Sequence, residues 1–447
     1  MGVAVPINRH VRMRRPVAVL AVLCTFLAFL ACPATAQTSN RPPDEYGQLI
    51  RQSGAFESTG DALFGDEVNG YTGELRIRQV DVDLPGNDLL QMTVARTFKP
   101  RSNVTRRGLF GDWDLELPRL GGMFSSSKGW TLDAQGLPTS AAGQRCSRFE
   151  PPVSAMGSHS VMWESKEYWY GYFLRLPDAD EEMILSPGAG MPMPADGATY
   201  RWLTPSGARL SCIALSTGGS GEGFRVRTPD GRVYTLDVMI SQSDRALEKY
   251  LPEPEYSFSV LNRKQVWLVP SSVSDRFGNT VTYTWSGNRL LSLQASDGRR
   301  IELSYDTAPG IDRIVAASAH GRSWSYAYDA AGNLSTVTRP DGSQWSLTLG
   351  ALSPVSELTM GGGCGDPGAA AEGDRSGSIT APAGATGSWT VRTVLHGRSQ
   401  VPNQCMGLAP DGLYSLNPAE FWSESVISRS ISGPGSAGSR FRARSWP

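Results

Sequence analysis

Residues 324–342 of the chain read WSYAYDAAGNLSTVTRPDG, and this stretch decides the fold. Large side chains alternate with small ones up to Tyr328, as in a strand whose successive side chains point to opposite faces. Asp329 then begins a turn, in which Gly332 can take a positive φ without steric cost. A second strand follows, and Asp-Gly at residues 341–342 is typical of a β-hairpin turn. The stretch therefore predicts short strands joined by tight turns.

The same unit occurs upstream in imperfect form. Tyr305-Asp306 stands 23 residues before Tyr328-Asp329, and Asp275 begins another turn of the form D-x-x-G-N. A fixed period of about 20 residues indicates a repeat architecture, here with one hairpin in each unit. The residues that define the repeat motif are Tyr305, Asp306, Tyr328, Asp329, Gly332, Asn333, Asp341 and Gly342.

This pattern closely resembles that of the YD-repeat, or RHS, family. The clear repeats cover residues 273–349, and a second stretch is similar to the N-terminal region of RHS proteins: VNGYTGEL at 68–75, DLPG at 83–86, RTF at 96–98 and GDW at 111–113. The resemblance implies an all-β fold, in which successive YD-repeat hairpins form a curling, spiral β-sheet that is part of an RHS shell. It also implies that the region 61–120 plugs or seats the exposed edge at the start of the spiral.

The first 36 residues have the features of a secretory signal peptide. Four arginines precede the apolar run 17–31, and Ala34-Thr-Ala36 offers a cleavage site that leaves Gln37 as the mature N-terminus. The run is short for a membrane span, so we expect no transmembrane segment after cleavage. Lipidation of Cys32 is the alternative. Either route predicts export from a bacterial cell, to the periplasm, the cell surface or the medium.

The charge balance argues against a nucleic-acid partner. Cleavage after Ala36 removes four arginines and no acidic residue, which changes the net charge from −1 to −5. Phosphate binding needs concentrated positive charge, and no cluster of lysine and arginine stands out in the remaining chain.

Four cysteines remain after cleavage, and an even number in an exported protein favours disulfides. Three pairings are possible. We expect Cys146–Cys212 and Cys364–Cys405, because each pair then lies within one region and closes a loop of moderate length. A zinc site is the alternative, but the sequence has no C-x-x-C spacing and no histidine near the cysteines. We therefore expect no metal and no cofactor.

The sequence pattern divides the chain into five parts. We expect a signal peptide at 1–36, a flexible lead-in at 37–60, an RHS N-terminal β region at 61–270 and YD repeats at 271–350. The part at 351–447 has a loop rich in glycine and alanine, a β tail and an irregular C-terminus. The repeat pattern is lost abruptly after residue 435, which favours a truncated RHS protein that lacks a C-terminal toxin.

No catalytic motif is apparent, and we expect no enzyme activity. The three histidines of the mature chain lie in different segments, and His396 is interpreted as a turn residue. The best candidates for binding are aromatic. As a strand, residues 168–173 would present alternate rings on one face, and exposed rings can stack on sugars; burial of this strand is the competing interpretation. The candidate carbohydrate-binding residues are Trp163, Tyr168, Trp169, Tyr170 and Tyr172.

The sequence therefore predicts one of two functions. The first is an exported, non-enzymatic RHS-repeat structural protein, the N-terminal part of a shell or surface assembly that in the family encloses or presents a C-terminal toxin or effector. The second is a β module that binds carbohydrate or a cell surface. Their partners would be a toxin or immunity protein encoded nearby, or cell-surface glycans.

Overall fold

The computed structural model describes most of the chain between residues 56 and 442. The described residues are 56–58, 62–86, 90–100, 108–132, 142–148, 150–177, 179–188, 190–251, 257–308, 311–352, 373–399, 419–434 and 439–442. The predicted signal peptide with its cleavage site at Ala36 and Gln37, nearly all of the lead-in, and both Cys364 and Cys405 lie outside them.

The described chain is almost entirely β, and its first part forms a sheet of five antiparallel strands. We refer to it as the N-terminal sheet. Its strands lie side by side in sequence order: β1 (Phe56–Ser58), β2 (Asp66–Asn69), β3 (Leu75–Leu84), β4 (Met92–Phe98) and β5 (Trp113–Leu115). A 3-10 turn at Ala62–Phe64 separates β1 from β2.

Nineteen further strands form one large sheet. They are β6 (Arg119–Ser125), β9 (Phe173–Arg175), β10 (Glu182–Met183), β11 (Tyr200–Leu203), β12 (Arg209–Ala214), β13 (Glu222–Arg227), β14 (Val233–Leu251), β15 (Ser257–Ser274), β16 (Thr280–Ser286), β17 (Arg289–Ala295), β18 (Arg300–Tyr305), β19 (Ile314–Ala319), β20 (Arg322–Tyr328), β21 (Leu334–Thr338), β22 (Gln344–Leu347), β23 (Arg375–Thr380), β24 (Thr386–Gly397), β25 (Glu420–Ser432) and β26 (Ser439–Arg442). The remaining elements are short: β7 (Ala155–Met156), η3 (Ser158–Ser160), β8 (Met162–Trp163), α3 (Ser165–Tyr168) and η4 (Gly350–Leu352).

The large sheet forks at β15. One edge of β15 pairs with β14, and its opposite edge pairs with β6 through residues 263–268 and with β16 through 272–274. On the β6 side the pairings run through β9 and β10, cross a bridge between Leu185 and Leu203, and return through β11–β13 to β14. On the β16 side each strand pairs with the next in sequence as far as β26. The fold is therefore all-β, with successive hairpins in one curling sheet, as predicted.

The predicted alternation is present in the repeat strands β16–β22. In β20, Trp324 and Tyr326 are buried, whereas Ser323, Ser325 and Ala327 are exposed. Leu334 and Val337 of β21 are buried on the same side. Burying a large apolar side chain stabilises a fold by about 1.5–3 kcal/mol, so each hairpin contributes several such side chains to one core.

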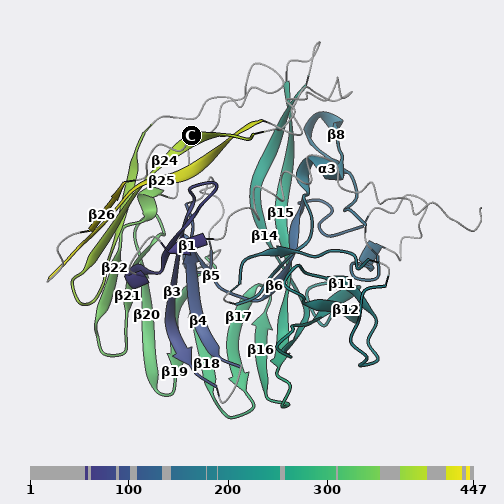
Figure 1. Cartoon of the computed structure of the whole chain (residues 1–447), viewed down its shortest axis with the longest axis horizontal. Helices are drawn as coiled ribbons and strands as arrows, with labels where there is room; N and C mark the ends of the chain where they lie inside the picture. The colour runs from purple at the N-terminus through teal and green to yellow at the C-terminus, as the bar shows by residue number, and fades with distance from the viewer. Residues whose placement is uncertain are drawn as a thin grey trace, which may run out of the picture.

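The N-terminal sheet lies in the hollow of the large sheet, as Figure 1 shows. Both sheets contribute to a single hydrophobic core. Phe64 packs edge-on against Trp389, with ring centres 5.7 Å apart, and Phe110 packs against Tyr326 at 4.7 Å. The region 61–120 was expected to cover the edge at the start of the spiral. Instead it covers the inner face of the sheet, and it reaches an edge at β25, near the end.

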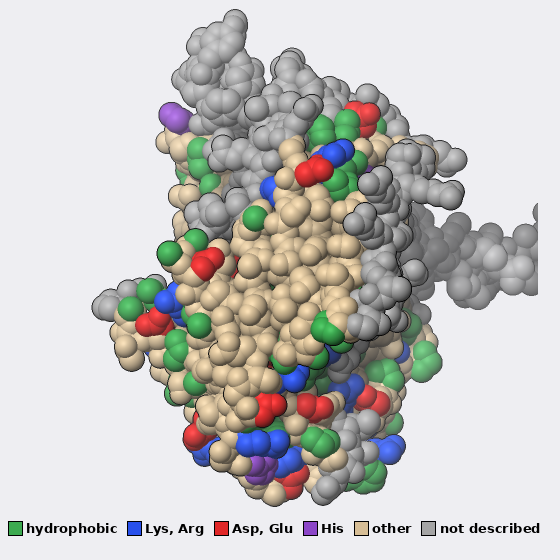
Figure 2. Space-filling view, turned by 90° about the vertical axis from the view of Figure 1, so that its left-hand side faces the viewer, with side chains coloured by type: hydrophobic (Ala, Val, Ile, Leu, Met, Phe, Trp, Pro, Cys, Tyr) green, Lys and Arg blue, Asp and Glu red, His purple; other side chains and the backbone are tan. Residues whose placement is uncertain are grey.

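The outer face around β22–β24 is polar but carries little charge. Figure 2 looks at the left-hand side of Figure 1 and shows a broad face with few charged side chains in its middle; most of them lie at the lower end, and a smaller group lies near the top. Hydroxyl groups pair across β22, β23 and β24: Thr348 with Ser378, Ser376 with Thr390, and Thr380 with Thr386. The large sheet thus has an apolar inner face and a polar outer one.

Two expectations differ from the structure. Residues 168–173 are not one strand: α3 ends at Tyr168, and β9 begins only at Phe173. The C-terminus was expected to be irregular, yet residues 439–442 form β26, which pairs with β25. Within the described part of the chain, no helix has the length and hydropathy needed to cross a bilayer.

Candidate functional site at the seam of the two sheets

The tyrosine of each Tyr-Asp pair fastens its strand to the strand before it. The Tyr305 hydroxyl at the end of β18 donates to the Leu290 carbonyl in β17 at 2.9 Å. The Tyr328 hydroxyl at the end of β20 donates to the Ile314 carbonyl in β19. Burial raises the pKa of both tyrosines above the ordinary value, so each hydroxyl keeps the proton that it donates.

An arginine lies over each of these two rings. The Arg289 guanidinium is 5.3 Å from the ring centre of Tyr305, and that of Arg313 is 4.5 Å from the ring centre of Tyr328. At such distances a cation is attracted to the ring face. Arg313 also pairs with Asp306 at 2.8 Å, which links the end of β18 to the start of β19. In both cases the arginine directly precedes the residue whose carbonyl accepts the tyrosine hydrogen bond, a spacing that the sequence interpretation missed.

The aspartates of the D-x-x-G-N turns have equivalent roles. The Asp329 carboxylate accepts from the backbone amide of Asn333 at 2.8 Å and from its side-chain amide at 3.0 Å. The Asp275 carboxylate accepts the same two bonds from Asn279, at 2.9 and 2.7 Å. Although partial desolvation acts to raise it, these bonds lower the pKa of Asp275. The repeat motif is therefore a set of local backbone fasteners.

The loop before β5 is held against the repeat strands by close backbone contacts. Leu334 N donates to the buried Asp112 carboxylate at 2.8 Å. Gly111 lies so near Gly332 that an added Cβ would stand 2.4 Å from the Gly332 carbonyl oxygen. The GDW motif of the N-terminal region thus contacts the D-x-x-G-N turn of the last clear repeat.

A buried ion pair joins β2 to the far end of the large sheet. The Asp66 carboxylate accepts two hydrogen bonds from the Arg429 guanidinium in β25, at 2.5 and 3.0 Å. Trp389 Nε1 in β24 donates to the same carboxylate at 3.1 Å. The side chain of Asp66 is fully buried and that of Arg429 is 5% exposed. Such a pair is stable only while both partners remain, because either charge alone would be buried without compensation.

The turn between β2 and β3 covers the edge of β25 beside its pairing with β26. Val426 N donates to the Gly73 carbonyl at 2.9 Å, and Glu74 forms a β-bridge with Ser425. His396 Nε2 lies 3.0 Å from the Ser425 hydroxyl, and burial lowers the pKa of His396. His396 was interpreted as a turn residue, but it lies buried in β24 at this contact.

We call these contacts between the N-terminal sheet and the large sheet the seam. Those of Gly73, Glu74 and Asp112 are made by residues in which the N-terminal stretch resembled RHS proteins, at 68–75 and 111–113, whereas Asp66 lies just before these motifs. The comparison with known proteins agrees with the resemblance: a model of the RHS repeat matches residues 309–344. The chain therefore contains an RHS repeat, and we refer to it as the RHS-repeat protein.

The similar solved structures are much longer. A chain of the Photorhabdus luminescens Tc holotoxin pore is 10% identical to this RHS-repeat protein, covers 85% of it with a TM-score of 0.32, and is itself covered to 21%. A TcdB2-TccC3-Cdc42 structure is 10% identical, with a TM-score of 0.13, and the match covers 82% of this chain and 23% of the other. The chain therefore spans about a fifth of the length of these two. No curated protein matches it.

The candidate carbohydrate-binding residues lie beside the fork. Trp163, Tyr168 and Tyr172 are buried, and Trp169 and Tyr170 are partly exposed. The polar atoms of the three buried residues have partners within the fold: Trp163 Nε1 donates to the Ser259 hydroxyl, and the Tyr168 and Tyr172 hydroxyls donate to the carbonyls of Val153 and Glu150. In the predicted face of Tyr168, Tyr170 and Tyr172, therefore, two of the three rings are inside the protein.

The predicted Cys146–Cys212 disulfide is present in the RHS-repeat protein. Cys146 belongs to the segment after β6, and Cys212 lies in β12. The Glu222 carboxylate in β13 accepts from the amides of Cys146 and Ser147 at 3.0 and 2.8 Å. These bonds fix the segment 142–148 on the strands. Across the described ranges, no group of three or more His, Cys, Asp or Glu side chains is placed to hold a metal ion.

Proposed function

We propose that this RHS-repeat protein is an exported, non-enzymatic structural protein, the N-terminal part of a shell or surface assembly. The large sheet is a wall with a polar outer face, and the N-terminal sheet fills and braces the hollow behind it. The observation that carries this proposal is the seam, in which the buried pair Asp66–Arg429 joins residues 363 positions apart. An assembly that presents a C-terminal toxin or effector is the role that the resemblance to RHS proteins implies.

A wall of this kind needs its last edge to be paired. At residues 428–431, β25 is already paired with β26, and the turn at Gly73 and Glu74 covers its neighbouring residues. An open strand edge is a template for pairing with another chain. We therefore expect the secreted protein to associate through β26, either with further β-strands of its own assembly or with a second copy.

Sedimentation of the secreted protein over a hundredfold range of concentration tests this role, together with hydrogen exchange of the backbone amides. We expect self-association, with amides of β26 gaining protection as the assembly forms and those of β2, β3 and β25 protected throughout. A protein that stays monomeric, with β26 unprotected at every concentration, would contradict the structural role.

A carbohydrate- or cell-surface-binding module is the second candidate. It is favoured by Trp169 and Tyr170, which are only partly buried, and by Arg263, whose guanidinium donates to the Tyr170 hydroxyl at 3.3 Å. A glycan array tests it: Trp169→Ala and Tyr170→Ala should abolish retention of a discrete ligand. Absence of any retained glycan, or retention unchanged by both substitutions, would rule it out.

A further inference from the structure

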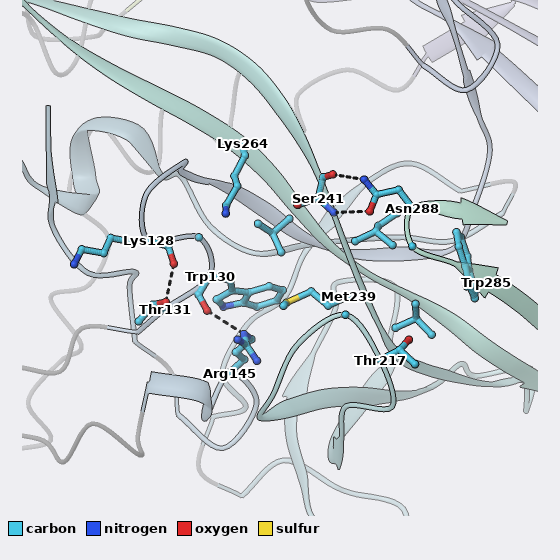
Figure 3. Close-up of a pocket in the computed structure, with 16 residues that line it drawn as sticks. Lys128, Trp130, Thr131, Arg145, Thr217, Met239, Ser241, Lys264, Trp285 and Asn288 are labelled. Carbon is cyan, nitrogen blue, oxygen red and sulfur yellow. Dashed lines mark hydrogen bonds between the residues drawn. The ribbon is translucent and has the colours of Figure 1, made fainter. Parts of the chain in front are cut away.

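A cavity of about 440 Å³ lies at the fork of the large sheet, and Figure 3 shows the residues around it. Its walls come from the segment 128–131 after β6, from β14 and β15, and from the turn 287–288 between β16 and β17. The cavity exists because β6 and β16 share one edge of β15 and then diverge. Its volume is in the range of small-molecule sites.

The side chains around this cavity give it a positive charge. Lys128, Arg145 and Lys264 contribute to the walls, and no aspartate or glutamate does. In Figure 3 the Lys264 side chain extends from β15 towards the cavity, whereas the Lys128 ammonium points away from the other labelled residues. Within the described ranges, no carboxylate pairs with Lys264.

Arg145 lines the cavity and is held in place by hydrogen bonds to two backbone carbonyls. It is 7% exposed, its Nε donates to the Trp130 carbonyl at 3.0 Å and one terminal nitrogen donates to the Ser220 carbonyl at 2.8 Å. Burial lowers the pKa of Arg145, which means that the guanidinium is partly desolvated where an anion would stabilise it. Glu222 attracts this cation, but its carboxylate is engaged by the amides of residues 146 and 147.

The other walls are partly apolar, partly polar, and closely built. Trp285 and Met239 supply an aromatic ring and a thioether, and the Asn288 side chain exchanges two hydrogen bonds with the backbone of Ser241. The loop residue Gly218 approaches β14 so closely that a Cβ would stand 1.9 Å from the Met239 carbonyl oxygen. Thus the cavity combines a cation that lacks a carboxylate partner with fixed apolar surfaces.

We propose that this cavity binds a small organic anion, a carboxylate or phosphate ester no larger than an acidic sugar, with its charged group on Lys264 and Arg145. Its apolar face would lie against Trp285 and Met239. This site is independent of the structural role, because none of its lining residues belongs to the seam.

Calorimetric titration of the intact secreted protein tests the proposal with a pair of probes that differ only in charge. Glucuronate should bind with a Kd of about 1 mM or tighter and more weakly as salt is added, and glucose should not bind. Comparing glucose 6-phosphate with glucuronate shows whether the site prefers a phosphate or a carboxylate. Comparing glucose 6-phosphate with inorganic phosphate shows whether the organic part is needed or the anion alone binds.

Two matched substitutions complete the test. Lys264→Gln removes the inward charge and should weaken glucuronate binding roughly tenfold or more, whereas Lys128→Gln should change it less than about twofold. Thermal melting of both variants establishes that they are folded. Any one of three results would overturn the proposal. Glucose and glucuronate could bind equally well, or no anion could bind at about 10 mM, which is ten times the expected Kd. The third is an unchanged affinity for glucuronate in folded Lys264→Gln.

Discussion

The repeat strands and the seam are held together by contacts of very different reach. In the repeats, the hydroxyl of each Tyr-Asp tyrosine bonds to a carbonyl 14 or 15 residues earlier, and the aspartate of each D-x-x-G-N turn bonds to an asparagine four residues later. In the seam, the bonded residues are 222 positions apart at Asp112 and 363 at Asp66. Local contacts that recur leave a period in the sequence, but a contact made once between distant segments does not. The two regions should therefore respond differently to substitution.

The largest effect is expected at Asp66. Asp66→Ala leaves Arg429 buried without its carboxylate and should destabilise the protein by about 3–5 kcal/mol. Urea unfolding measures the loss, and hydrogen exchange should show that β2 and β3 lose protection first. The control is Glu302→Ala, which breaks an exposed pair with Arg300 in the repeats and should cost less than about 1 kcal/mol. Equal effects of the two variants would contradict the distinction between seam and repeats.

Substitutions at two glycines distinguish the cost of backbone strain within a turn from the cost of a clash across the seam. Gly111 and Gly342 have similar positive φ angles, 71° and 80°, but only Gly111 has a backbone atom where a Cβ would be placed. Gly342→Ala should therefore cost only the conformational strain, about 1–2 kcal/mol. Gly111→Ala adds the clash with the Gly332 carbonyl and should cost about 2–4 kcal/mol in the same unfolding experiment. If both variants lose the same stability, the contact between the loop and the repeats is not formed.

A smaller and local effect is expected from the repeat tyrosines. Tyr328→Phe removes one hydrogen bond to the Ile314 carbonyl and should cost about 1 kcal/mol. Exchange should increase in β19 and β20 but not in the N-terminal sheet. Tyr283→Phe is the matched control, since Tyr283 is half-buried and its hydroxyl has no partner among the described residues, and it should be close to neutral. Loss of protection across the seam in Tyr328→Phe would show that the repeats are not locally fastened.

The strands and turns of the repeats could be predicted from sequence because their causes are local. The alternation around Trp324 and the turn at Gly332 depend on neighbours within a few residues, and the structure has both. The Cys146–Cys212 disulfide could be predicted because the mature chain has an even number of cysteines and these two lie in the same region of the sequence. The pair Asp66–Arg429 could not be predicted, because each residue alone resembles an ordinary surface charge.

The aromatic stretch shows why the remaining expectations failed. A strand through residues 168–173 was expected from alternation alone, but Glu164 and Glu167 form a capping box that starts α3. The Glu167 carboxylate accepts from the Glu164 amide at 2.6 Å, a spacing that the sequence does carry. The cavity at the fork left no such signal, because Arg145 and Lys264 come from distant segments that only the sheet topology brings together.

The smallest effect concerns pH and also distinguishes the seam from the repeats. Burial lowers the pKa of His396 below its ordinary value of 6.5, so the folded protein favours the neutral ring. Its contribution is fully present above pH 6.5 and is lost as the pH falls through the folded-state pKa, because the unfolded chain then binds the proton more readily. Unfolding measured from pH 7.5 to 5.5 should show a loss of stability that His396→Gln reduces. His320→Asn serves as control, since His320 is exposed in the turn between β19 and β20 and should leave the pH dependence unchanged. Should both variants follow the parent protein, the pH dependence would arise elsewhere, and His396 would not be the titrating group of the seam.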